Sequence, residues 1–150
     1  TFLDASYTLK IVGADESEIV DSNEISKNLG LESRVTILGR VGYSDVAKQL
    51  SSSSIGILIN SSMNKHSTSY TSPLKYFEYL DARLKVIAVD FPSHRELPFS
   101  DKITFFQDGN IESLVSAINE LDYLDILDTN VLSSISLETR AKKIIDFLSY

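Results

Sequence analysis

Segment 72–78 combines residue types that are suited to binding a phosphorylated ligand. Ser72 and Pro73 are typical of a helix start, because serine caps free N–H groups and proline fits the first helical position. The amides of residues 74–76 then have no intrahelical acceptor, and with the helix dipole they favour an anion such as a phosphate. Lys75 adds a cation in a first turn where positive charge otherwise weakens a helix. The pattern predicts an anion site at this helix start.

Glu78 follows Lys75 by three residues and therefore lies on roughly the same helical face. A carboxylate one turn from a phosphate site is well placed to accept hydrogen bonds from a ribose diol, as acidic residues do in dinucleotide sites. Two plainer interpretations stay open at this point. The helix start can be capped without binding any ligand, and Lys75 and Glu78 can form an ordinary surface ion pair.

Asp15, Glu16 and Glu18 form an acidic cluster after the first apolar segment. Such a cluster resembles the acidic pocket of a response-regulator receiver, another α/β domain. A receiver needs its phosphoacceptor aspartate after the third strand, and Asn60 stands there instead. The cluster therefore does not favour a receiver.

Metal and nucleophile chemistry receive little support from the residue types. The chain has no cysteine, and its two histidines, His66 and His94, are not at ligand spacing. His66 falls in a polar loop and is expected to face solvent. There is no G-x-S-x-G nucleophile elbow and no D-x-D pair suited to a metal, so no catalytic residue is assigned, and metal-independent binding is expected.

The composition indicates an ordinary globular domain. The chain has 150 residues, of which 43% are hydrophobic and 23% charged, and we expect one domain over residues 1–150. A formal net charge of −7 disfavours nucleic acid as a partner. No apolar run approaches the roughly 18 residues of a membrane span, and residues 1–10 do not resemble a signal peptide. We expect a cytoplasmic protein.

Short apolar runs alternate with amphipathic segments along the whole chain. The pattern predicts strands at residues 7–13, 34–39, 55–60, 86–90 and 103–106, and helices at 22–29, 44–50, 73–82, 111–121 and 137–148. The first predicted helix, 22–29, has Ser22 as its expected N-cap, and its Ile25 and Leu29 are expected on one face. Strands that are apolar on both faces predict a doubly wound, Rossmann-like parallel sheet. Ligands of such sheets bind beyond the carboxyl ends of the strands.

The segment Ser72 to Asp90, SPLKYFEYLDARLKVIAVD, closely resembles a segment of the C-terminal domain of family 4 (group 1) glycosyltransferases of the GT-B fold. There a helix that carries a glutamate leads into A-x-G-K-P-V-I-A-T-D. The flanking segments KIVGAD, RVTILGRVGYSDVAKQL, SSIGILIN, DFPSHRELP and FFQDGNIESLVSAI resemble further segments of that domain in the same order. The resemblance covers roughly residues 7–149.

This resemblance implies a binding site for a nucleotide-sugar donor. Glu78 falls on the second glutamate of the E-x7-E motif and would bind the donor ribose. The diphosphate would be held around Ser72, Leu74 and Lys75, the base would contact Arg40 and Val41, and the donor sugar would lie near Tyr70 and Thr71. Tyr70 stands where the family has the first glutamate, whereas Arg83 and Lys85 replace a glycine and a proline after the helix.

The expected function is therefore that of a glycosyltransferase donor-binding domain, of hexosyltransferase type, which acts with retention at the anomeric carbon. The partners implied are a UDP-, GDP- or ADP-sugar and a glycan or lipid-linked acceptor, as in polysaccharide biosynthesis. The family's N-terminal, acceptor-binding domain is not part of this sequence, so we expect the fragment alone to be inactive and its parent to lie peripherally at the inner membrane face. Two alternatives remain: a non-catalytic sugar-nucleotide-binding or scaffold module, and another GT-B enzyme such as a nucleotide-sugar epimerase.

Overall fold

The computed structural model describes residues 3–60, 62–63, 68–69, 73–121, 133 and 136–148. Helices alternate with parallel strands, which confirms the predicted α/β class. The chain divides into two compact units, Thr1–Ser52 and Ser53–Tyr150. Each unit is described by itself below, and a single domain over residues 1–150 stays a prediction.

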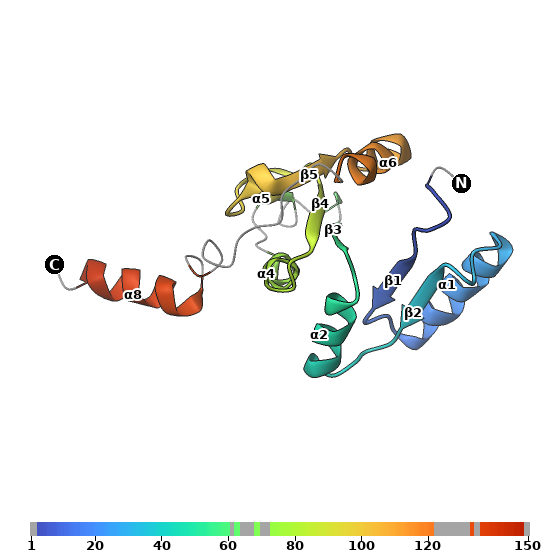
Figure 1. The fold of residues 1–150 in the computed structure, drawn as a ribbon, viewed down its shortest axis with the longest axis horizontal. Helices are drawn as coiled ribbons and strands as arrows, with labels where there is room; N and C mark the ends of the chain where they lie inside the picture. Colours follow the sequence, from blue (N-terminus) through green and yellow to red (C-terminus); the bar gives the residue numbers. More distant parts are fainter. Residues whose placement is uncertain are drawn as a thin grey trace. The chain divides into compact units, whose positions relative to one another are not determined.

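The first unit is a two-stranded parallel sheet with two helices (Figure 1). Its elements are β1 (Leu9–Val12), α1 (Glu16–Asn28), β2 (Val35–Leu38) and α2 (Tyr43–Ser51). Ile11 of β1 pairs in register with Ile37 of β2, and α1 packs against β2. All four residues of β1 are exposed, although the apolar run had predicted a strand covered on both faces.

The start of α1 differs from its prediction. The helix begins at Glu16, six residues before the expected position, and its N-cap is Asp15. Ser22 lies inside the helix and caps nothing. The apolar side chains of Ile25 and Leu29 are exposed, at 59% and 65%, because a two-stranded unit offers few partners for burial.

The second unit holds a three-stranded parallel sheet in the order β3-β4-β5 (Figure 1). Its elements are β3 (Ile55–Leu58), α4 (Leu74–Asp81), β4 (Lys85–Val89), α5 (Pro92–Arg95), the 3-10 turn η1 (Ser100–Lys102), β5 (Ile103–Phe106), α6 (Ile111–Glu120) and α8 (Leu137–Leu148). These strands and helices lie within two residues of the predicted bounds, apart from the short α5 and η1, which the periodicity did not predict.

The core of this unit surrounds the central strand β4. Val86 and Ala88 face a cluster that includes Tyr76 and Leu80 of α4. The alternate residues of β4, among them Ile87, are also buried, so this strand is covered on both faces as its apolar run predicted. The helix that carries the candidate site therefore rests on the most buried strand described.

The end of α4 forms a Schellman turn around Arg83. The Arg83 amide donates to the Leu80 carbonyl at 3.0 Å, and the Leu84 amide donates to the Tyr79 carbonyl at 2.9 Å. Arg83 has φ 57°, in the left-handed region where a side chain is strained. The end of α1 has the same motif, but there glycine occupies the left-handed position, since Gly30 has φ 66°.

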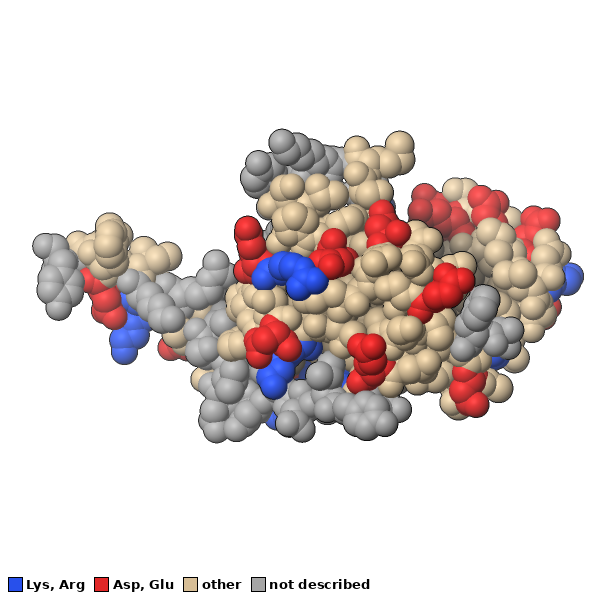
Figure 2. All heavy atoms as spheres, turned by 90° about the horizontal axis from the view of Figure 1, so that it is seen from above, with Lys and Arg blue, Asp and Glu red and all other residues tan. Residues whose placement is uncertain are grey.

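The described residues show a surface with more acidic than basic side chains and no membrane-spanning helix. Acidic side chains are spread over the face seen in Figure 2, in keeping with an excess of 21 Asp and Glu over 14 Lys and Arg. Within the described ranges, no helix combines the length and the apolar character needed to cross a bilayer.

We expect Arg83→Gly to stabilise the protein by about 0.5–1 kcal/mol, because glycine adopts the left-handed conformation without a Cβ penalty. The free energy of unfolding in urea checks this prediction. Gly30→Ala supplies the matched control, and it should lower stability by a similar amount. A loss of stability in Arg83→Gly would show that the arginine side chain outweighs the backbone strain.

Candidate functional site

The predicted site lies at the start of α4, with a shift of one residue at its cap. Pro73 is the N-cap, with φ −72° and ψ 121°, and Leu74 is the first helical residue. The sequence had placed Ser72 at the cap and Pro73 in the first turn, but the extended backbone of Pro73 puts it outside the helix. Ser72, Thr71 and Tyr70 lie outside the described residues, so their predicted contacts with the donor stay predictions.

The three amides expected to be unpaired at this helix start differ from one another. The Tyr76 amide donates to the Pro73 carbonyl at 3.0 Å, so the prediction that it is unpaired is wrong. This bond closes a tight first turn, as is common at helix ends. For the amides of Leu74 and Lys75, the described part of the chain provides no acceptor. The anion site predicted at three amides is therefore reduced to two.

At the starts of α1, α4 and α6 the amide of the third helical residue has an acceptor, which is a side chain in α1 and α6 and a backbone carbonyl in α4. The starts of α2 and α5 also have no side-chain cap. Asp15 accepts from the Glu18 amide at the start of α1, and Asn110 accepts from the Ser113 amide at the start of α6. No side-chain bond caps α4, and its first turn has no acidic residue. Lys75 stands in that turn instead. This combination leaves the positive end of the helix dipole without a negative side chain among the described residues.

The side chains of Lys75 and Glu78 lie on the outer face of α4. Tyr76 and Leu80, one turn apart, face the core, and Glu78 is two residues from each, on the opposite side. Lys75 is exposed and Glu78 is half-buried. No ion pair joins them, and within the described residues neither charged group has a hydrogen-bond partner, so the surface-pair interpretation receives no support.

Tyr76 fixes α4 to the segment that precedes β5. Its side chain is fully buried, and its hydroxyl donates to the carbonyl of Pro98. Burial, assisted by the negative charge of Asp101, raises the pKa of Tyr76 to about 12. The hydroxyl is therefore protonated, and available as a donor, throughout the physiological pH range. This bond holds the helix that carries Lys75 and Glu78.

The acidic cluster near residue 15 is explained by helix capping. The Asp15 carboxylate accepts from the Glu18 amide at 2.9 Å, and the Glu18 carboxylate accepts from the Asp15 amide at 2.8 Å. These reciprocal bonds form a capping box, and the bond from the Glu18 amide, together with one from the Ser17 hydroxyl, lowers the pKa of Asp15. The cluster therefore stabilises α1 and gives no support to a receiver-like site.

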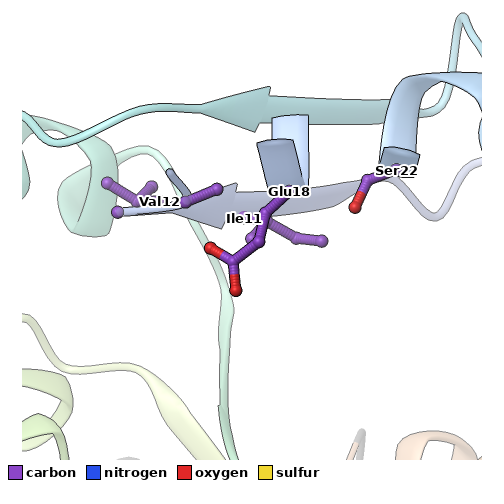
Figure 3. A pocket seen from close by; sticks show the side chains of 6 residues that line it. Ile11, Val12, Glu18 and Ser22 are labelled. Carbon is purple, nitrogen blue, oxygen red and sulfur yellow. The ribbon is translucent and has the colours of Figure 1, made fainter. Parts of the chain in front are cut away.

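A hollow of about 300 Å³ lies beside this capping box (Figure 3). Glu18 projects from the start of α1 near Ile11 of β1. The lining consists of Ile11, Val12, Gly13, Ala14, Glu18 and Ser22. None of the residues predicted to bind the donor lines it, so we do not assign it a part in the candidate site.

Arg40 and Val41 follow β2 in the first unit. Arg40 is exposed and Val41 is half-buried. The Gly13 amide donates to the Leu38 carbonyl at 3.0 Å, which ties the loop after β1 to the carboxyl end of β2. The loop that would contact the base is thus held by backbone bonds, and its role stays a prediction.

His94 is fully buried after β4, although the sequence gave no reason to expect a buried ring there. Its Nδ1 lies 2.7 Å from the Val89 carbonyl, and its ring stacks on Phe91 with centroids 5.9 Å apart. No group of three or more potential metal-ligating side chains occurs among the described residues. His66 lies outside them. The Val89 bond and the Phe91 stacking fix the ring of His94 in the turn after β4, while its buried Nε2 has no hydrogen-bond partner among the described residues.

An ion pair that the sequence reasoning missed also lies after β4. Arg95 makes two bonds to the Asp90 carboxylate, at 2.6 and 2.8 Å, and its guanidinium lies 4.4 Å from the ring centroid of Phe105. The Arg95 hydrogen bonds lower the pKa of Asp90. The spacing of five residues across a turn is not a helical pair, so periodicity gave no signal for it.

We expect Arg95→Gln to raise the pKa of Asp90 toward its ordinary value of 3.8, because the charged partner of the carboxylate is lost. A carbon-detected NMR titration of the carboxyl group measures this directly. The pKa of Asp90 is lower in the folded than in the unfolded protein. The Asp90–Arg95 pair therefore stabilises the fold at pH values above the unfolded pKa of Asp90, and this stabilisation is lost as the pH falls through its folded pKa. An unchanged Asp90 titration in the variant would contradict the assignment.

Comparison with known proteins connects this geometry to one family. The family model described as "Glycosyl transferases group 1" matches residues 3–122 of the chain. No curated protein and no solved structure matches it. All the residues predicted to contact a donor lie within the matched span.

Proposed function

The chain belongs to the group 1 glycosyltransferases, and we propose that it binds a nucleotide-diphosphate sugar with the diphosphate at the start of α4. A glycosyltransferase of this family moves a sugar from a donor to an acceptor. The observation that carries the proposal is the pair of Leu74 and Lys75 amides, for which the described residues supply no acceptor. Phosphate oxygens are acceptors that suit two adjacent amides at the positive end of a helix dipole.

Lys75 and Glu78 complete the proposed site from the same helix. Lys75 would place a cation beside the diphosphate, and it is exposed and unpaired within the described residues. Glu78 lies one turn further along and would accept hydrogen bonds from the ribose hydroxyls. A half-buried carboxylate loses less water when a ligand binds than a fully solvated one, which favours its use as a ligand group.

The proposed chemistry follows from the leaving group. The bond between the anomeric carbon and the diphosphate oxygen breaks, the oxygen of the acceptor hydroxyl forms the new glycosidic bond, and its proton passes to the departing nucleoside diphosphate. Negative charge builds up on the diphosphate as that bond breaks. Fixed amides and the Lys75 ammonium group would stabilise this charge without reorganising, so we propose that no metal ion is needed.

The remaining donor contacts are proposed from the family resemblance. The base would contact Arg40 and Val41, and the sugar would lie near Tyr70 and Thr71, with Ser72 on the diphosphate. We further propose that acceptor binding requires protein that is not part of these 150 residues, so that the chain alone does not transfer sugar.

A non-catalytic sugar-nucleotide-binding module is the second candidate function. Tyr70 favours it, because the E-x7-E motif has a carboxylate where this chain has a phenol. The activity of the full-length protein separates the two candidates. Binding of a nucleotide sugar without turnover in the presence of acceptors supports the module, and transfer supports the enzyme.

We expect Glu78→Gln to weaken the binding of UDP, GDP or ADP by about 1.5–3 kcal/mol, the scale of hydrogen bonds to charged groups. Titration calorimetry with the three nucleotides measures the loss. Asp81→Asn is the matched control, because Asp81 is an exposed acid one turn further along the same helix. Equal affinities for Glu78→Gln and the wild type would remove Glu78 from the site.

A further inference from the structure

Tyr79 follows Glu78 directly and packs against a glycine in the neighbouring strand. Gly56 of β3 is buried beneath the Tyr79 ring. A Cβ atom at residue 56 would lie 2.5 Å from Cγ and 2.8 Å from Cε2 of that ring. Carbon atoms pack at about 3.5–4.0 Å, so any side chain at this position must displace the ring. The ring therefore occupies its place only because residue 56 has no side chain.

Two hydrogen bonds fix Tyr79 in addition to this packing. Its hydroxyl donates to the Ile57 carbonyl of β3 at 3.3 Å. Its own carbonyl accepts from the Leu84 amide at 2.9 Å, in the turn that leads into β4. Tyr79 thus connects α4 to β3 through its side chain and to the turn before β4 through its backbone.

The attachment through Tyr79 differs from the one through Tyr76. Tyr76 fixes α4 to the carbonyl of Pro98, before β5, whereas Tyr79 fixes it to β3. Glu78 lies between these two tyrosines in sequence, and it points away from the core that Tyr76 enters. A displacement of the Tyr79 backbone must therefore move the Glu78 carboxylate, which has no partner of its own among the described residues.

We propose that Tyr79 is a positioning residue for Glu78, and that Gly56 is required because it leaves room for the Tyr79 ring. The inference rests on the proposed function, in which Glu78 binds the donor ribose. Tyr79 itself touches no ligand in this account. Tyr79 sets the rotation of α4 about its axis, and this rotation sets the direction of the Glu78 carboxylate. A misplacement of that carboxylate by about 1 Å weakens its interaction with the ligand.

The raised pKa of Tyr79 agrees with a short distance between its phenol and the Glu78 carboxylate. Burial raises the pKa of Tyr79, and the negative charge of Glu78 raises it further. The phenol therefore stays protonated and continues to donate to the Ile57 carbonyl, and the Glu78 carboxylate lies within electrostatic reach of it.

The test uses calorimetry with the tightest binder among UDP, GDP and ADP, together with the urea unfolding free energy of each variant. Gly56→Ala should raise the Kd about tenfold, because the displaced ring moves α4. Tyr79→Ala should raise it less, since the ring is lost without a clash. In the double variant, Gly56→Ala should add little to Tyr79→Ala, because the ring through which it acts is gone.

Ile118→Val in α6 is the matched control for a general loss of stability, because it removes one buried methyl group from a helix that packs against β5. It should lower the unfolding free energy and leave the Kd unchanged. If Gly56→Ala does not fold, Tyr79→Ala decides the question by the same comparison. A Kd equal to that of Ile118→Val in the folded variants would overturn the positioning role.

The outcomes also separate this inference from the proposed function. If the wild type binds none of the nucleotides, or if Glu78→Gln binds as the wild type does, the proposed function fails and the positioning role fails with it. If Glu78→Gln weakens binding and the Gly56 and Tyr79 variants do not, the positioning role alone is wrong.

Discussion

Two backbone N–H groups at the start of α4 need an acceptor that the described chain does not supply. A helix of this length always has unpaired amides at its start, and at α1 and α6 the side chains of Asp15 and Asn110 each accept from the amide of the third helical residue. At α4 the cap is Pro73, which has no side-chain acceptor. Unpaired amides are tolerable at a surface that water reaches, and they become a binding site when an anion replaces that water. The proposed donor site depends on these two amides, in a first turn that carries Lys75 and no acidic side chain.

The packing beneath α4 shows how such a site can be held rigid. Tyr76 and Leu80 enter the core around β4, so the opposite face of the helix is fixed toward the outside. The hydroxyls of Tyr76 and Tyr79 donate to backbone carbonyls in two different segments. The Schellman turn at Arg83 then fixes the end of the helix to β4. Preorganisation of this kind lowers the ordering cost of ligand binding.

Most strands and helices of both units could be predicted from sequence to within two residues, but the start of α1 could not. The run Val86–Asp90 predicted a buried strand because both of its faces are apolar, and β4 is buried on both. The start of α1 was misplaced because a reciprocal bond between Asp15 and Glu18 is invisible to hydrophobic periodicity. At the site, spacing placed Lys75 and Glu78 on one face of α4, and the buried Tyr76 and Leu80 show that this is the outer face. Spacing could not show that Pro73 is the N-cap, or that the Pro73 carbonyl accepts a hydrogen bond from the Tyr76 amide. Both features depend on backbone angles.

The central claim is that a diphosphate binds the amides of Leu74 and Lys75. Proton–nitrogen NMR spectra of the chain, recorded during a titration with UDP, GDP and ADP, test it at those two atoms. We expect large, saturable shifts of the Leu74 and Lys75 amide signals with at least one nucleotide, and little change for the Glu18 amide, which already donates to the Asp15 carboxylate. Saturable binding that leaves the signals of residues 74 and 75 unmoved would contradict it.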